Sequence, residues 1–327
     1  MIIIKTPLRM SFAGGGSDIG SYYHHGYGSV VSTAIDKYMY VFFNKTFDAR
    51  IRVIYSQVEY VDEIDEIKQN LAREAFKLVG ISGGGIDIAY MGDMLPAHTG
   101  SGLGASSSLT IGILNALHTY KGDHISPEIL AQEACQIEIE ILSRPIGKQD
   151  QYATAFGGLN YIQFDRDDSV TVTPLNCSQG VLEELKHNLL LFYTGLKTQS
   201  DNILTELTIN TQNNTHILSR MVELAKHLKN ALENNNLNEF GNILHEGWLL
   251  KQRLATAISN KTIDNYYQKA REAGAIGGKI LGSGGGGFLL LYCKEENQTN
   301  VRNALINLRE TSFNFESEGS KIIYNSD

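Results

Sequence analysis

The order of strand-like and helix-like segments constrains the fold of this chain more than any other feature of the sequence. Segments rich in β-branched and aromatic residues predict strands early in the chain, among them Ile2–Lys5, Arg9–Ala13, Ser29–Ala34 and Tyr38–Asn44. Two long stretches with helical periodicity, Asp201–Glu233 and Leu237–Ile258, dominate the second half. Strands and helices therefore mix without strict βαβ alternation, which predicts an α+β fold rather than a doubly wound sheet.

The length of the chain is compatible with two packed lobes or with one large one. A chain of 327 residues, of which 42% are hydrophobic, exceeds the size of a single typical hydrophobic core. The more polar stretch Asn176–Lys186 is a candidate boundary between lobes. We therefore expect one lobe over residues 1–180 and another over residues 181–327.

Charge and cysteine content argue against several classes of function. The net charge is −8 and the basic residues are scattered singly, so no basic stripe could neutralise a nucleic-acid backbone. The three cysteines are far apart and form no CxxC, which disfavours disulfides and zinc and is typical of a reducing cytoplasm. The longest apolar runs, such as Phe288–Cys293, are too short to span a membrane. We expect a soluble, cytoplasmic protein that binds neither nucleic acid nor membrane.

A glycine- and serine-rich segment, Pro96–Ser108, leads directly into an apolar helical stretch. Its glycines, Gly100, Gly102 and Gly104, allow successive backbone N–H groups to turn toward one point, and the helix adds its positive N-terminal end. Serine hydroxyls at a helix start either cap the helix or ligate magnesium. The alternative is a plain loop before a serine-capped helix, but the run of small residues favours a phosphate-binding loop.

Two further glycine clusters lie near the ends of the chain. Gly14–Asp18 follows a strand-like segment that carries Arg9, and its aspartate is either a turn former or a functional carboxylate. Gly282–Gly287 has the letters of a dinucleotide fingerprint but leads into a strand, so it is either a hairpin turn or a ligand contact. The pairs Gly147-Lys148 and Gly278-Lys279 lack the Ser or Thr that a Walker loop requires.

Phosphoryl transfer would need carboxylates as well as phosphate-binding loops. Magnesium takes oxygen ligands, and the attacking hydroxyl needs a proton acceptor or a positioning group. Ser126 is a predicted N-cap, and Glu138 flanks the buried face of the helix that runs from there to about Leu142. Asp150 follows a Pro/Gly break. The nearby Lys148 would keep the Asp150 carboxylate ionised. Helical periodicity alone is equally compatible with solvated acids at both positions.

Taken in order along the chain, the three glycine loops resemble the motifs of the GHMP kinase superfamily. Thr6–Asp18 resembles its first motif, Gly100–Ser107 its ATP-phosphate loop, and Lys279–Gly286 its third motif. The resemblance spans nearly the whole chain. Within the superfamily it is closest to the D-glycero-D-manno-heptose 7-phosphate kinases, although fucokinase-type domains share some of the segments concerned. These segments are Arg9–Asp18, Ala34–Tyr38, Gly147–Tyr152 and Phe156–Asn160.

The resemblance implies ATP and Mg²⁺ as ligands and a ribosomal-S5-like lobe over 1–180 packed on a ferredoxin-like lobe over 181–327. At matching positions, Asp150 is the catalytic aspartate and Arg9 the cation near the transferred phosphoryl group. Ser106 and Glu138 are the implied magnesium ligands. The implied nucleotide contacts are Gly100, Ser101, Gly102, Leu103, Gly104, Ala105, Ser106 and Ser107. The implied substrate contacts are Gly15, Gly16, Ser17, Asp18, Gly282, Gly284 and Gly285.

The resemblance also implies a reaction. ATP would phosphorylate the anomeric C1 hydroxyl of D-glycero-D-manno-heptose 7-phosphate, giving the 1,7-bisphosphate for GDP-heptose and surface polysaccharide synthesis. A phosphorylated substrate needs a second anion pocket, for which Lys197, Lys148 and Arg144 are candidates. The alternatives are a kinase for a free sugar such as fucose or galactose, and a non-catalytic nucleotide-binding module. The sequence does not predict an oligomeric state.

Overall fold

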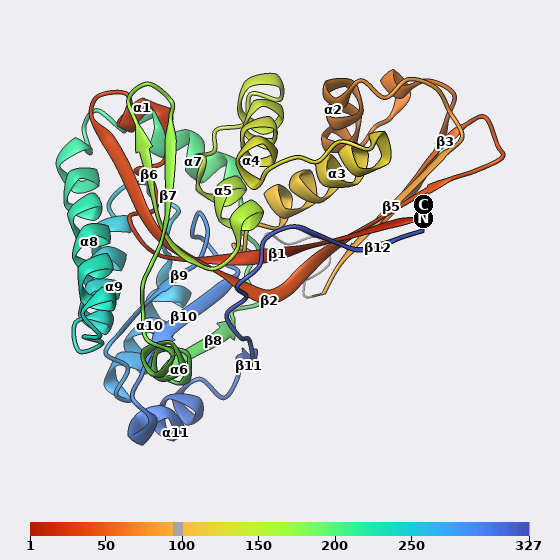
Figure 1. Cartoon of the computed structure of the whole chain (residues 1–327). Helices are drawn as coiled ribbons and strands as arrows, with labels where there is room; N and C mark the ends of the chain where they lie inside the picture. The colour runs from red at the N-terminus through yellow and green to blue at the C-terminus, as the bar shows by residue number, and fades with distance from the viewer. Residues whose placement is uncertain (94–100, 327) are drawn as a thin grey trace.

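The computed structural model describes residues 1–93 and 101–326, and this part of the chain folds around two β-sheets (Figure 1). The larger sheet has eight strands in the described residues, and the mixture of sheets and helices confirms the predicted α+β class. Its order is β12 (Lys321–Asn325), β1 (Ile2–Ala13), β2 (Tyr27–Lys45), β5 (Ile86–Gly92), β3 (Ile51–Ile54) and β4 (Val58–Val61), with β6 (Leu159–Asp165) paired to β2 and β7 (Val170–Pro174) paired to β6.

The strands β1 and β2 are each continuous where the sequence predicts two separate strands. They pair with each other along most of their length, and the register shifts between Pro7 and Leu8. The residues between the predicted strands stay extended because the partner strand is paired on both sides of this irregularity. The first part of β2 also pairs with β6, and its second part pairs with β5. This one strand therefore connects the β6–β7 pair to the strands β5, β3 and β4.

A layer of helices covers one face of the larger sheet (Figure 1). The central helix of this layer, α3 (Ala105–Lys121), is apolar around most of its circumference, and most of its residues are therefore buried. Ser126 caps the next helix as predicted, because its hydroxyl accepts a hydrogen bond from the Ile129 N–H at 3.3 Å. The helical segments of this half are α1 (Gly20–Tyr23), η1 (Ile64–Glu66), α2 (Asn70–Val79), α3 (Ala105–Lys121), α4 (Pro127–Cys135), η2 (Gln136–Ile141) and α5 (Gln149–Phe156).

The smaller sheet is built from the second half of the chain and has four antiparallel strands in the described residues. A single helix predicted over Asp201–Glu233 is instead two helices, because the polar residues 210–214 form a turn. The strand order is β11 (Arg309–Glu310), β8 (Leu189–Tyr193), β10 (Phe288–Tyr292) and β9 (Gly277–Ile280). The helices of this half are α6 (Gln179–His187), α7 (Ser200–Ile209), α8 (Thr215–Glu233), α9 (Phe240–Lys251), α10 (Lys261–Glu272) and α11 (Glu295–Ala304).

The two halves of the sequence are interleaved at the C-terminus. The polar stretch Asn176–Lys186 contains much of α6, whose Leu185 is fully buried. The last strand, β12, pairs antiparallel with β1, so both ends of the chain lie side by side in the larger sheet (Figure 1). The division at residue 180 stays a prediction, and the C-terminal strand crosses it.

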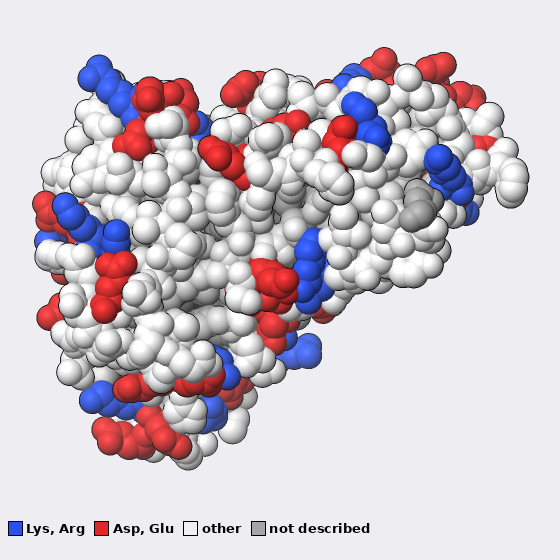
Figure 2. Space-filling model, in the orientation of Figure 1, with Lys and Arg blue, Asp and Glu red and all other residues white. Residues whose placement is uncertain are grey.

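The surface carries charges of both signs. On the face drawn in Figure 2, Lys and Arg form small groups interspersed with Asp and Glu. The expectation that the protein does not bind nucleic acid stays a prediction. In the described part of the chain, no helix combines the length and the apolar character needed to cross a bilayer.

Candidate active site

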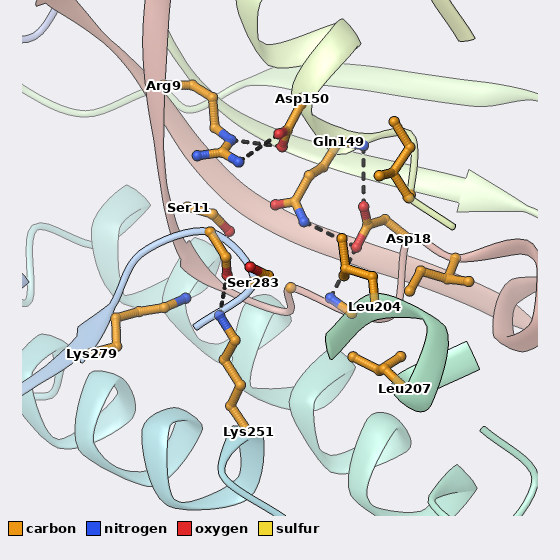
Figure 3. A pocket seen from close by; sticks show the side chains of 16 residues that line it. Arg9, Ser11, Asp18, Gln149, Asp150, Leu204, Leu207, Lys251, Lys279 and Ser283 are labelled. Atoms are coloured by element: carbon orange, nitrogen blue, oxygen red, sulfur yellow. Dashed lines mark hydrogen bonds and ion pairs between the residues drawn. The ribbon is translucent and has the colours of Figure 1, made fainter. Parts of the chain in front are cut away.

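A pocket lies where β1, the start of α5, the end of α9 and the loop between β9 and β10 meet (Figure 3). Its empty volume is about 630 Å³, including the part that is open to solvent. Its apolar lining comes from Ile19, Ile146, Leu204 and Leu207, and its polar side chains from Arg9, Ser11, Asp18, Gln149, Asp150, Lys251, Lys279 and Ser283. The fold thus gathers acids and cations from both halves of the sequence around one cavity.

Arg9 and Asp150 form a bidentate ion pair in this pocket (Figure 3). The Arg9 Nε and Nη2 atoms donate to the two Asp150 carboxylate oxygens at 2.7 and 2.6 Å, and Nη1 donates to the Gly102 carbonyl at 2.7 Å. Arg9 extends from β1, whereas Asp150 lies in the first turn of α5, a helix that the sequence analysis did not predict. The cation beside Asp150 is therefore not the predicted Lys148, which pairs with Asp168 at 2.7 Å.

The described part of the predicted nucleotide loop, residues 101–104, lies against the loop between β9 and β10. Gly102 has a φ of +73°, and a Cβ atom there would lie 2.5 Å from the Leu281 carbonyl oxygen. Gly104, with a φ of +75°, directly precedes α3. The Arg9 N–H donates to the Leu103 carbonyl at 3.0 Å and fixes the loop to β1. The N-terminus of α3 therefore lies close to Arg9, a pocket residue, and a helix N-terminus is a favourable position for an anion.

The two predicted magnesium ligands, Ser106 and Glu138, lie together. The Ser106 hydroxyl donates to Glu138 Oε2 at 3.2 Å, and Arg144 Nη1 lies 2.6 Å from the same hydroxyl and 3.3 Å from the same carboxylate oxygen. Glu138 is fully buried and lies in η2, which is a π-helix and therefore has wider turns than an α-helix. Burial raises the pKa of Glu138, and the Arg144 guanidinium opposes this rise.

The chemistry of this place fits a Mg²⁺ ion. Glu138 Oε1 is buried and accepts no hydrogen bond of good geometry from the described residues, although the hydroxyls of Thr110 and Ser107 are close enough to lower the pKa of Glu138. This oxygen could therefore also serve as a cation ligand. A carboxylate and a hydroxyl suit Mg²⁺, which takes one or two protein ligands beside phosphate oxygens and water. The described residues contain no cluster of three or more His, Cys, Asp or Glu side chains that could hold a metal ion alone. A cation at Glu138 would therefore depend on phosphate oxygens.

Asp18 is buried in the pocket wall and is held from two sides. Its Oδ1 accepts hydrogen bonds from the Gly16 N–H at 2.9 Å and from Gln149 Nε2 at 3.0 Å, and its Oδ2 accepts one from the Gln149 N–H at 3.2 Å. Gly147 permits this approach, because a Cβ atom there would lie 2.0 Å from Asp18 Oδ2. Burial raises the pKa of Asp18, whereas the Gly16 N–H lowers it.

The other predicted substrate residues fall into two groups. Gly15, Gly16 and Gly282 line the pocket. The second group supports the surrounding backbone and lies outside the pocket wall: the Ser17 hydroxyl lies 2.8 Å from the Gly14 carbonyl, and Gly284 and Gly285 pack against Ile258 and Ala257.

The residues proposed for a second anion pocket do not share a site. Lys197 is exposed and lies outside the pocket wall. Lys148 is paired with Asp168, and Arg144 with Glu138. Among the predicted nucleotide contacts, Gly100 lies outside the described residues, Ser101, Leu103 and Ser107 are buried, and Ala105 and Ser106 begin α3.

Two pocket lysines were not predicted as site residues: Lys251 at the end of α9 and Lys279 in β9, which are 6% and 5% exposed. The Lys251 Nζ donates to the Gly282 carbonyl, and the Lys279 Nζ donates to the Phe12 carbonyl at 3.3 Å. Burial lowers the pKa of Lys251 to about 8 and that of Lys279 well below its usual range. For Lys279, the sequence did contain a signal of burial, because this lysine lies within a strand of otherwise glycine and apolar residues.

Family comparisons agree with this geometry. The family model for the GHMP kinases N terminal domain matches residues 65–158, and the model for the GHMP kinases C terminal region matches residues 228–309. The chain belongs to the GHMP kinase superfamily, a class of kinases that use ATP.

Individual relatives include sugar and sugar-phosphate kinases. The chain is 28% identical to the D-glycero-alpha-D-manno-heptose 7-phosphate kinase of Campylobacter jejuni over 97% of both chains. It is 26% identical to the L-fucokinase/L-fucose-1-P guanylyltransferase of Bacteroides fragilis over 89% of this chain and 34% of that protein. The solved structure of a D-glycero-D-manno-heptose 1-phosphate kinase from Bacteroides thetaiotaomicron has a TM-score of 0.83, with 26% identity and full coverage of both chains. The predicted GHMP kinase architecture is confirmed.

Proposed function

We propose that this protein is an ATP-dependent sugar kinase that phosphorylates the anomeric C1 hydroxyl of D-glycero-D-manno-heptose 7-phosphate. The product would be the 1,7-bisphosphate, a precursor for GDP-heptose and surface polysaccharide synthesis. Membership of the GHMP superfamily and the similarity to the Campylobacter jejuni kinase support the reaction class. The observation that carries the proposal is that the Arg9 guanidinium joins the Asp150 carboxylate in the pocket wall to the Gly102 carbonyl of the adjoining nucleotide loop.

In the proposed reaction, Asp150 is the proton acceptor. Its carboxylate takes the proton of the C1 hydroxyl while the hydroxyl oxygen bonds to the γ-phosphorus of ATP, and the bond from that phosphorus to the β,γ-bridging oxygen breaks to release ADP. Arg9 fixes both carboxylate oxygens and places positive charge beside the transferred group, where negative charge is spread over the phosphoryl oxygens. The buried Asp18 is available to accept a hydrogen bond from a sugar hydroxyl.

The nucleotide and metal would be bound at the start of α3. Backbone N–H groups of residues 101–104 and of the first turn of α3 would contact the ATP phosphates. Ser106 and Glu138 would hold Mg²⁺, which neutralises phosphate oxygens when it is bound.

A product assay with a panel of acceptors tests the proposed function. Purified protein, ATP and Mg²⁺ are incubated in parallel with the heptose 7-phosphate, the heptose 1-phosphate, fucose and galactose, and the new phosphate ester is located by phosphorus NMR. We expect turnover of the 7-phosphate with the new ester at C1. Turnover only of free sugars would support the free-sugar alternative. Turnover only of the 1-phosphate would match the name of the Bacteroides thetaiotaomicron kinase. ATP binding without transfer to any acceptor would support a non-catalytic module.

A further inference from the structure

The wall of the pocket that comes from the second half of the chain carries two lysines without an acidic partner (Figure 3). The Nζ atoms of Lys251 and Lys279 donate to the backbone carbonyls of Gly282 and Phe12. Across residues 1–93 and 101–326, neither Nζ lies within ion-pair distance of a carboxylate. Both side chains are nevertheless almost completely buried.

Two neighbouring ammonium groups in this environment are unfavourable. Both are withdrawn from water, and the charges of Lys251 and Arg9 further lower the pKa of Lys279. Asp18 favours the charged form of both lysines but hydrogen-bonds to neither. Buried charges of this kind, without a partner in the protein and facing a cavity, are typical of a site whose counter-ion is a ligand.

Ser11 gives an independent indication of the same site. It is 6% exposed, lines the same pocket, and its hydroxyl has no hydrogen-bond partner among the described residues. It lies in β1 directly before Phe12, whose carbonyl accepts the hydrogen bond from Lys279. An unpaired hydroxyl beside two ammonium groups provides a set of donors that suits an oxyanion with several acceptor atoms.

We propose that Lys251, Lys279 and Ser11 form a binding subsite for a phosphate dianion inside the active-site pocket. The chemistry of the subsite follows from these residues, whereas the identity of the molecule that carries the phosphate rests on the proposed function. Two groups in the proposed reaction have this chemistry: the phosphate on the sugar, and the γ-phosphoryl group of ATP. The γ-phosphoryl group is a candidate because the lysines lie close to the nucleotide loop. The Gly282 carbonyl accepts the hydrogen bond from Lys251, and a Cβ atom on Gly282 would lie 2.4 Å from the Gly102 Cα of that loop.

Inorganic phosphate tests the subsite without assuming any substrate. Binding is measured by titration calorimetry and thermal unfolding on the full-length protein and on Lys251→Met, Lys279→Met and Ser11→Ala, with the exposed Lys226→Met on α8 as the matched control. Phosphate should raise the Tm of the parent protein and of the control. The affinity of each lysine variant should fall about 10-fold or more, because a hydrogen bond to a charged group is lost.

The unliganded variants show whether they are folded. Lys279→Met should have a Tm at or above that of the parent protein, because an apolar side chain replaces a buried charge without a partner. A stable Lys279→Met protein that binds phosphate as tightly as the parent would overturn the subsite. Phosphate affinity that is lost only in Lys197→Met would overturn it as well, and would place the anion site at the exposed lysine.

Steady-state kinetics distinguish the two sources of phosphate. For a sugar-borne phosphate, the lysine variants raise the KM for the heptose 7-phosphate about 10-fold or more and leave the KM for ATP unchanged. For the γ-phosphoryl group, they lower kcat or raise the KM for ATP and leave the KM for the heptose 7-phosphate unchanged. Unchanged kinetics with both substrates would reject both sources. Lysine-dependent binding of inorganic phosphate in a protein that does not turn over any heptose phosphate would reject the proposed substrate but not the subsite.

Discussion

The two walls of the pocket differ in how positive charge is neutralised. On the wall from the first half of the chain, Arg9 is held by both oxygens of Asp150. On the wall from the second half, Lys251 and Lys279 donate to backbone carbonyls only, within the described chain. Arg9 is 3% exposed, and the lysines are buried to a similar extent, so burial does not explain the difference. The first wall contains its own anion and is preorganised, whereas the second wall is completed by an anion that a ligand brings.

Replacement of Asp150 by Asn removes the carboxylate that pairs with Arg9, and among the proposed substitutions it should have the largest effect on activity. The amide cannot accept the hydroxyl proton, so kcat should fall roughly 10²-fold or more, whereas the Kd for ATP should change little. Single-turnover kinetics and a nucleotide titration measure the two quantities separately. A variant with unchanged kcat would remove Asp150 from the mechanism.

A substitution at Gly102 tests whether the two walls are held in contact. Ala at this position combines a positive φ with overlap on the Leu281 carbonyl, so we expect a loss of about 2–4 kcal/mol in the free energy of unfolding. Gly122 is the matched control, because it has a φ of +82° and no neighbouring atom within 4 Å of a Cβ atom. Gly122→Ala should cost only about 1 kcal/mol. Equal losses in urea denaturation would mean that the loops can separate freely.

Arg144 and Glu138 form a second ion pair within the first half of the chain. Its side chain is 28% exposed, whereas Glu138 is 0% exposed, so Arg144→Met should lower the free energy of unfolding by about 2 kcal/mol, less than for a fully buried pair. With ATP present in all samples to supply phosphate oxygens, added Mg²⁺ should restore more of the Tm in this variant than in the parent protein, because the cation takes over the role of the guanidinium.

The control for this prediction is Arg302→Met, which removes an arginine from an exposed pair with Glu310. Its Tm should change little, and it should respond to Mg²⁺ as the parent protein does. An identical Mg²⁺ response in Arg144→Met and Arg302→Met would contradict a cation site at Ser106 and Glu138.

The lysines without an acidic partner, Lys251 and Lys279, should make the affinity for phosphate depend on pH. Burial lowers the pKa of Lys251 to about 8, with Arg9 acting in the same direction and Asp18 and Asp150 opposing it; the neighbouring Lys279 also faces this group. Phosphate binding requires the ammonium form, so affinity should be greatest below this pKa and fall as the pH rises through it. The expected loss in affinity for the phosphate dianion between pH 7 and 9 is roughly 10-fold, less any increase in the pKa that the bound anion causes. Calorimetry across this range measures the slope, which should flatten in Lys251→Met.

Local features of the fold could be predicted from the sequence with good accuracy. The Ser126 cap and the helix after the Gly104 loop are confirmed. Of the two interpretations left open for Gly282–Gly287, the structure shows a hairpin between β9 and β10, with Gly282 also in the pocket wall. The short strands β3 and β4 were missed, and β1 and β2 were each predicted as two pieces. Strand length depends on the partner strand, and β2 is long because three different strands pair along it.

The candidate site was predictable only in part. The resemblance to the GHMP motifs pointed to Arg9, Asp18, Glu138 and Asp150, and the structure places Arg9, Asp18 and Asp150 around the pocket. Glu138 lies beside Ser106 at the start of α3, the two residues that the resemblance implied as partners. Residue spacing suggested Lys148 as the partner of Asp150 and led to no prediction for Lys251 or Lys279. A lysine in a sequence is normally solvated, and only packing from several elements reveals one that is buried.

The sequence by itself determined the order of the glycine loops, the caps and turns beside them and the α+β class. These depend on residues a few positions apart, since backbone torsions and capping hydrogen bonds are local. Only the tertiary structure decided which cation faces which carboxylate and which cations are left unpaired. Arg9 and Asp150 are separated by 141 positions in the sequence, and the energy of their interaction depends on distance through space and on burial, which spacing along the chain does not encode.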